Sequence, residues 1–331
     1  MLASAHTFMK EVICEAKNLV KHYPLRATRF GSTPGVVRAV EDVSFCLARR
    51  EVFALVGESG CGKSTLGRLL LRFEEPTSGQ VFFEGKDLGS LNARQIFDFR
   101  RRAQIIYQDP YSALNPRKKI GRLIEEPLAI HHWGSASERR ERVIDLLSRV
   151  GLRPEHAERY PHEFSGGQRQ RIVIARALAL NPVFLVADEP VSALDVSIQA
   201  QVINLLEELQ KEYQLTYLFI SHDLSVVEHM AHRIGVMYLG RLVEIGTREA
   251  FFQEPLHPYA QALLSAAPVP DPSATARKPR LLLEGDVPSP IRPPSGCPFH
   301  PRCRERASIC SQVMPPLKEI EPGRSVACHR R

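Results

Sequence analysis

The sequence contains no run of about 18 consecutive apolar residues, the length that a membrane-spanning helix needs. Its first residues, MLASAHTFMKEV, have no apolar run after a basic start, so they do not resemble a secretory signal. These two absences predict a soluble, cytoplasmic protein.

The sequence also has little excess of either charge. Its 331 residues include 44 Lys and Arg against 37 Asp and Glu, a formal net charge of +7. After residue 267 there are 11 basic and 6 acidic residues, so most of the excess belongs to the C-terminal part. A small excess in that position argues against a nucleic-acid-binding groove. The composition, 44% hydrophobic and 24% charged, is that of a globular protein with room for about two domains.

Cysteine is scarce in most of the chain. There are seven cysteines, and an odd number in a reducing compartment argues against a framework of disulfides. Four of them lie within the last 35 residues, which requires a separate explanation: Cys297, Cys303, Cys310 and Cys328.

Proline marks the main boundary, because 15 of the 25 prolines lie between Pro255 and Pro322. Before that point, short apolar runs at 52–56, 104–107, 183–187 and 217–220 predict buried strands of a mostly parallel sheet. Apolar residues with helical spacing at 143–150 and 202–209 predict amphipathic helices between them. We therefore expect an α/β core over residues 10–250, with a helical insertion at about 109–163 and a Pro-rich, Cys-bearing part at 251–331.

A glycine-rich loop follows the first of these strands. Residues 52–70, VFALVGESGCGKSTLGRLL, match the pattern G-x-x-x-x-G-K-[ST] between a strand and an apolar helix. Backbone N–H groups of such a loop surround a phosphate at the positive end of the helix. Lys63 can reach the β- and γ-phosphates, and Ser64 can ligate Mg²⁺. Cys61 is then a small loop residue rather than a catalytic thiol. The predicted nucleotide-binding loop comprises Gly57, Glu58, Ser59, Gly60, Cys61, Gly62, Lys63, Ser64 and Thr65.

A second candidate strand ends in two carboxylates, in the sequence VFLVADEP at 183–190. Open α/β sheets place their active groups at this end of a strand. Asp188 is a candidate to hold Mg²⁺, and Glu189 to polarise the attacking water. The alternative is that the acidic pair only caps the next element.

The chain resembles the ATP-binding subunits of ATP-binding cassette (ABC) transporters, because the further motifs of that family follow in the family's order. FSGGQRQR at 164–171 resembles the family signature, with Phe164 in place of the usual leucine. Gln108 resembles the Q-loop glutamine, SALD at 192–195 the D-loop, and His222 the switch histidine. Tyr23 matches the aromatic residue that stacks on adenine. The resemblance spans about residues 23–222.

The resemblance implies a P-loop, RecA-like ATPase core with a small antiparallel β subdomain and a helical subdomain. It implies catalytic roles for Glu189, His222 and Lys63, and Mg²⁺ coordination by Ser64, Gln108 and Asp188. It further implies that Ser165, Gly166, Gly167 and Gln168 contact the γ-phosphate of the nucleotide bound to a partner cassette. Asp195 of the D-loop is also expected among the nucleotide-site residues. The expected partners are two transmembrane permease subunits, a second, different ATPase and, indirectly, a solute-binding protein, at the cytoplasmic face of the inner membrane.

The C-terminal part narrows the resemblance. LHPYAQALLSA at 256–266 resembles the tail of ATPase subunits of oligopeptide, dipeptide and nickel importers. From the residues alone, His257-Pro258-Tyr259 could simply begin a small docking helix, with no chemistry of its own.

The four late cysteines could bind a metal. Four thiolates can hold an iron–sulfur cluster or a tetrahedral zinc ion. Their spacing, C-x5-C-x6-C-x17-C, lacks the short pairs of zinc knuckles. CPFHPRC resembles the iron–sulfur tail of some peptide-importer ATPases, which favours [4Fe–4S]. Zinc and the absence of a metal remain alternatives, with His300 and His329 as possible substitute ligands.

The sequence thus predicts an ATP-hydrolysing subunit of a peptide importer, with ATP, Mg²⁺ and a [4Fe–4S] cluster, and with no nucleic-acid partner. A soluble ABC ATPase acting on DNA or ribosomes is the alternative. The single phosphate loop and the lack of a long heptad run argue against it. An exporter ATPase is a third possibility, which the HPY-like tail disfavours.

Overall fold

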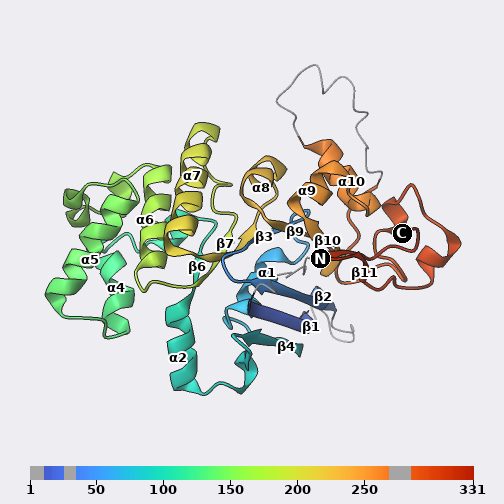
Figure 1. Cartoon of the computed structure of the whole chain (residues 1–331), viewed down its shortest axis with the longest axis horizontal. Helices are drawn as coiled ribbons and strands as arrows, with labels where there is room; N and C mark the ends of the chain where they lie inside the picture. Colours follow the sequence, from blue (N-terminus) through green and yellow to red (C-terminus); the bar gives the residue numbers. More distant parts are fainter. Residues whose placement is uncertain (1–10, 26–34, 268–284) are drawn as a thin grey trace, which may run out of the picture.

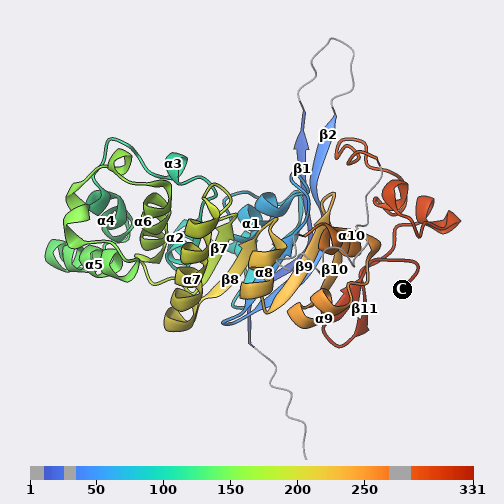
Figure 2. The ribbon, with the colours of Figure 1, turned by 90° about the horizontal axis from the view of Figure 1, so that it is seen from above.

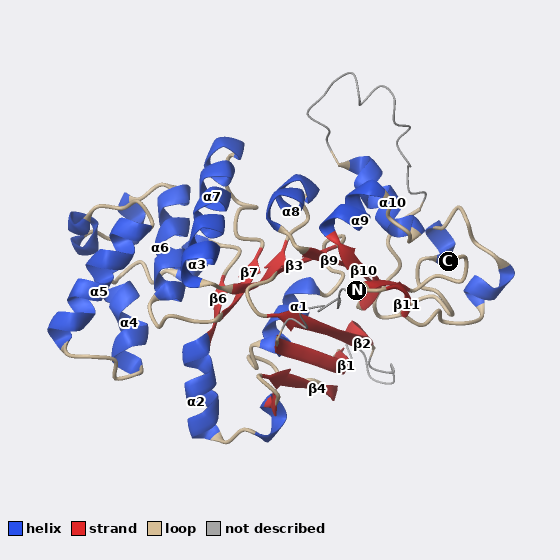
Figure 3. Ribbon diagram, viewed as in Figure 1, coloured by secondary structure: helices blue, strands red, loops and turns tan. Residues whose placement is uncertain are grey.

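The computed structural model describes residues 11–25, 35–267 and 285–331. Two sheets form its centre (Figure 3). The smaller is antiparallel, with order β2-β1-β4-β5. Its strands are β1 (Val12–Pro24), β2 (Val36–Ala48), β4 (Ser78–Phe83) and β5 (Lys86–Asp87).

The larger sheet has the order β11-β12-β10-β9-β3-β8-β7-β6. The strands from β9 to β6 are parallel to one another, whereas β10, β12 and β11 join antiparallel. The bounds are β3 (Val52–Val56), β6 (Ala103–Ile106), β7 (Phe184–Asp188), β8 (Thr216–Ile220), β9 (Arg233–Tyr238), β10 (Arg241–Thr247), β11 (Lys318–Glu321) and β12 (Arg324–Val326). Strands β3 and β8 are wholly buried, which explains their continuous apolar runs.

Helices occupy one end of the molecule and both sides of the larger sheet (Figures 1 and 2). They are α1 (Lys63–Leu70), α2 (Ala93–Arg102), α3 (Pro110–Ala113), α4 (Ile120–Ile130), α5 (Ala136–Arg149), α6 (Gly166–Leu178), α7 (Val196–Tyr213), α8 (Leu224–Met230), α9 (Arg248–Gln253) and α10 (Pro258–Ala266). Short 3₁₀ turns are η1 (Leu88–Ser90), η2 (Pro154–Glu158), η3 (Pro161–Glu163), η4 (His300–Arg302) and η5 (Ser308–Ser311). In the described part of the chain, no helix has the length and apolar character needed to cross a membrane.

The predicted fold class is confirmed: an α/β core carries an antiparallel sheet and a helical part. The predicted helices at 143–150 and 202–209 lie in α5 and α7, and the insertion contains α3, α4 and α5. The strand predicted at 52–56 has these bounds, whereas the other three differ by one residue at one or both ends. The difference at β6 excludes Tyr107, which is exposed. In the helical part, Phe164 is buried in the same apolar core as Leu146 and Ile172, so the aromatic ring at this signature position fills core space.

The C-terminal part does not stand apart from the core. Strand β12 pairs with β10, so residues after 317 extend the larger sheet. Phe299 packs with Tyr238 and Tyr259 in a cluster that also includes residues of β3 and β9. The proposed division at residue 250 therefore separates stretches of sequence that share one sheet and one apolar cluster.

The HPY segment begins a helix, as the sequence suggested. His257 is the N-cap of α10, and its Nδ1 accepts a hydrogen bond from the Tyr259 N–H at 3.1 Å. Burial lowers the pKa of His257 to about 3, so the ring is neutral and can act as an acceptor. Glu244 accepts from the N–H groups of Leu256 and His257, which attaches the segment to β10.

Candidate nucleotide-binding site

The predicted phosphate loop lies between β3 and α1, at the carboxyl end of the parallel strands (Figure 1). Lys63 is buried, and its Nζ donates to the carbonyl oxygens of Gly57 at 2.7 Å and Glu58 at 3.0 Å. Burial raises the pKa of the Cys61 thiol, which fits a packing role rather than that of a nucleophile. The loop therefore surrounds a lysine ammonium beside the N-terminus of α1, a suitable arrangement for a polyphosphate.

The two halves of the predicted site meet at Ser64 and Asp188. The Ser64 hydroxyl donates to Asp188 Oδ1 at 2.8 Å, although 124 residues separate them. Burial raises the pKa of Asp188, as does the neighbouring charge of Glu189. A hydroxyl and a carboxylate held together at this edge of the sheet are suitable ligands for Mg²⁺, whose charge would favour the ionised carboxylate.

Glu189 lies between two other predicted residues. Its Oε2 accepts from Gln108 Nε2 at 2.9 Å and lies 3.2 Å from His222 Nδ1. The Glu189 side chain is 15% exposed, whereas that of His222 is 58% exposed. The backbone of Glu189 has φ of 46°, a left-handed conformation that is uncommon outside glycine and recurs at functional sites. Three strand ends thus bring a base candidate, an amide and an imidazole to one point.

Tyr23 lies beside the phosphate loop, on β1. Its hydroxyl donates to Glu74, and its pKa is raised by burial and by that contact, with an opposing hydrogen bond from Thr65 of the loop. The ring is partly exposed. Tyr23 therefore lies at the edge of the phosphate loop, and its contact with adenine stays a prediction.

The signature residues lie at the start of α6, as predicted. Ser165 is the N-cap, and it exchanges hydrogen bonds with Gln168 in a capping box. Gly167 is buried against Ile198 of α7, since an added Cβ would lie 2.3 Å from Ile198 Cγ2. Asp195, exposed at the start of α7, makes no capping hydrogen bond through its side chain. The described contacts of this set join α6 and α7 to each other, which leaves its exposed groups available to another molecule.

Sequence reasoning missed the role of the C-terminal part at the phosphate loop. Tyr259 and Arg302 contact Glu58 directly. The buried Tyr259 belongs to the HPY segment, to which the sequence assigned no chemistry. In the sequence Arg302 is one of several basic residues near the late cysteines, and no signal distinguished it from the others.

The four late cysteines occupy one neighbourhood. Burial raises the pKa of Cys297 to about 11, and the charges of Cys310, Cys303 and Cys328 act in the same direction. All four are free thiols. Within residues 11–25, 35–267 and 285–331, no three His, Cys, Asp or Glu side chains converge as the ligands of a single metal ion would.

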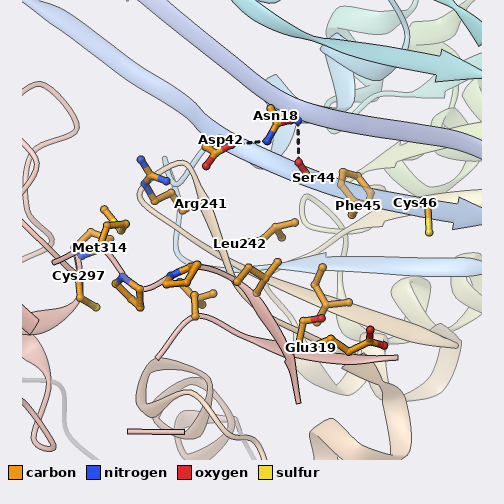
Figure 4. A pocket seen from close by; sticks show the side chains of 18 of the residues that line it. Asn18, Asp42, Ser44, Phe45, Cys46, Arg241, Leu242, Cys297, Met314 and Glu319 are labelled. Atoms are coloured by element: carbon orange, nitrogen blue, oxygen red, sulfur yellow. Dashed lines mark hydrogen bonds between the residues drawn. The ribbon is translucent and has the colours of Figure 1, made fainter. Parts of the chain in front are cut away.

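A cavity of about 800 Å³ separates the C-terminal part from the antiparallel sheet (Figure 4). Asn18, Asp42 and Ser44 form a hydrogen-bonded group on one side. Cys297 and Met314 of the C-terminal part line the cavity as well, together with Leu242 of β10. The C-terminal part therefore joins the larger sheet through β12 but leaves an open space on the side that faces the antiparallel sheet.

Two family models match the chain. Residues 40–192 match a model described as "ABC transporter", and residues 243–310 match one described as "Oligopeptide/dipeptide transporter, C-terminal region". The chain is 54% identical to a protein of Sinorhizobium fredii named "Probable peptide ABC transporter ATP-binding protein y4tS", over 98% of this chain and 91% of the relative. It is 52% identical to "Oligopeptide transport ATP-binding protein AppF" of Bacillus subtilis, over 97% and 98%. It is 50% identical to "Dipeptide transport ATP-binding protein DppF" of Escherichia coli, over 99% and 97%.

Solved structures with the same fold include a dimeric, post-hydrolysis state of the ATP-binding cassette MJ0796 bound to ADP and Pi. Its TM-score is 0.63 at 29% identity, over 71% of this chain and 99% of that one. A second is cbiO1 of Clostridium perfringens, from the cbiONQ transporter complex, with a TM-score of 0.63 at 27% identity over 74% and 92%.

Proposed function

The chain belongs to the family of ABC transporter ATP-binding proteins, and from this premise we propose the role that its site supports. It is the ATP-binding and hydrolysing subunit that energises an importer of di- or oligopeptides. The relatives named for peptide transport match it over nearly their whole length, including the C-terminal part.

The observation that carries this proposal is the position of Glu189 between Gln108 and His222, next to Ser64 and Asp188. Glu189 can orient water and accept its proton as the water oxygen attacks the γ-phosphorus. The bond to the β-phosphate oxygen then breaks, and ADP leaves. His222 and Lys63 hold the charge that develops on the phosphoryl oxygens. Bound Mg²⁺, held by Ser64, Asp188 and Gln108, would supply further charge neutralisation.

The family implies permease subunits and a solute-binding protein as partners. We infer that a second cassette completes the ATP-binding site. The reason is that the exposed Ser165 and Asp195 make no described contact with the chain's own phosphate loop. We propose that this second cassette is a different ATPase and that the complex lies at the cytoplasmic face of the inner membrane. ATP binding would close the pair, and hydrolysis would reopen it.

A pull-down from detergent-solubilised native membranes tests the transport role. We expect the tagged chain to bring two polytopic membrane proteins and a second cassette ATPase, identified by mass spectrometry. A Ser165→Arg variant, which places a bulky cation at the predicted partner surface, should lose the second ATPase. Recovery of the wild-type chain with ribosomes or DNA instead would contradict the transport role and support the soluble alternative.

For the four cysteines we propose a [4Fe–4S] cluster. Four free thiols lie in one neighbourhood, and burial raises the pKa of Cys297, Cys303 and Cys328, which disfavours bare thiolates at these three positions. A cluster would supply the missing positive charge. Because a cluster is wider than one ion, its thiolates need not converge on a point, which favours the cluster over zinc.

Iron and sulfide analysis after anaerobic purification tests the cluster. We expect about four iron and four sulfide per chain, and a Cys303→Ser variant should lose most of both. A Cys46→Ser variant, which changes a cysteine outside the group, should keep them. A colourless wild-type protein free of iron under these conditions would exclude the cluster, and zinc in its place would support the alternative.

A further inference from the structure

The phosphate loop is attached to the C-terminal part through its second residue, Glu58. The Glu58 N–H donates to the Tyr259 hydroxyl at 2.8 Å. Tyr259 is fully buried near the start of α10, with its ring against Tyr238 and Phe299. The Glu58 N–H therefore has a protein partner, and it is not one of the amides left for phosphate.

The Glu58 side chain makes a second attachment. Arg302 donates to both of its carboxylate oxygens, at 2.9 and 3.1 Å, across 244 residues of sequence. Arg302 is 9% exposed and also lies 3.5 Å from the Tyr238 hydroxyl. The pair with Glu58 raises the pKa of Arg302, which is therefore charged. Two-point guanidinium–carboxylate pairs fix orientation as well as distance.

These attachments lead directly to the phosphate-binding lysine. Lys63 donates a hydrogen bond to the Glu58 carbonyl oxygen. Three groups of Glu58 are therefore hydrogen-bonded: its amide to Tyr259, its carboxylate to Arg302 and its carbonyl to Lys63. A displacement of Glu58 would move the carbonyl that holds Lys63 and turn the neighbouring loop amides. Removing either attachment should therefore alter nucleotide binding, although neither Tyr259 nor Arg302 lies among the predicted nucleotide ligands.

We propose that Tyr259 and Arg302 are positioning residues for the phosphate loop. Arg302 lies in η4, between Cys297 and Cys303. Together the two residues hold Glu58, and through its carbonyl oxygen Lys63, in the arrangement that binds ATP.

A double-mutant cycle tests the attachment. ATP affinity, from a fluorescent analogue, and steady-state KM and kcat are measured for Glu58→Gln, Arg302→Gln and the double variant, with thermal unfolding as a check on folding. Arg302→Gln should weaken ATP binding about tenfold and raise KM more than it changes kcat. The double variant should be no worse than Arg302→Gln, because the carboxylate left unpaired in the single variant is then absent.

Two further variants separate positioning from general stability. Tyr259→Phe removes only the hydroxyl that accepts from Glu58 and should weaken ATP binding several-fold. Arg306→Gln changes an exposed arginine of the same segment and should leave affinity and turnover unchanged. Additive effects in the cycle, or normal ATP affinity in Arg302→Gln, would overturn the positioning role.

Discussion

Replacing Glu189 with Gln is expected to reduce ATP hydrolysis by about 10²- to 10⁴-fold while ATP binding persists. Glutamine keeps the size of the side chain, but it cannot take the proton of the attacking water. Glu189 already contacts Gln108 and His222, so the variant should remain in place and lose only the base. Turnover by a phosphate-release assay, with nucleotide affinity measured in parallel, checks this result.

The matched control is Glu228→Gln, which removes an exposed carboxylate from α8. It should leave turnover and affinity unchanged. Near-normal hydrolysis by the Glu189 variant would remove this residue from its role, whereas loss of ATP binding would show that the substitution had disturbed the site itself.

Replacing Gly62 with Ala should abolish most nucleotide binding and destabilise the fold by about 2–4 kcal/mol. Gly62 has φ of 106°, and an added Cβ would lie 2.0 Å from the carbonyl oxygen of Ala39. This oxygen belongs to the backbone of β2, so the loop or β2 has to move, and the amides that face a phosphate would turn away. Denaturant unfolding and ATP affinity measure the two effects.

A Gly60→Ala variant separates the effect of a steric clash from the effect of backbone strain. Gly60 also has a positive φ, 77°, but an added Cβ would have no neighbour within 4 Å. We expect it to cost about 1–2 kcal/mol of stability, from the left-handed conformation alone. Equal destabilisation by the two alanines would show that the contact with Ala39 has no effect.

The chemistry of the site was largely predictable because it depends on short, local patterns. The phosphate loop needs glycines and a lysine at fixed spacing, and the strand ending in Asp188 and Glu189 carries its own signal of burial and charge. The capping box at Ser165 is equally local, since the residues that bond each other are three apart. Such patterns specify backbone and side chain together, so few other structures fit them.

Contacts across long stretches of sequence were not predictable. Nothing in the order of motifs indicated that Glu189 would contact both Gln108 and His222, or that strand β12 would extend the larger sheet. The attachment of Glu58 to Tyr259 and Arg302 is the clearest case, because each residue has an ordinary interpretation alone: a loop position, a helix start and a basic residue among prolines.

The sequence by itself therefore determined the α/β class and the nucleotide chemistry, and it predicted the residues that would carry that chemistry. The tertiary structure alone decided which of them touch, and that the Pro-rich C-terminal part reaches the phosphate loop. The physical reason is that local motifs are selected by backbone geometry over a few residues. Pairing of Glu58 with Arg302 instead depends on how β9, β10 and α10 pack, which buries the guanidinium where one carboxylate can meet it.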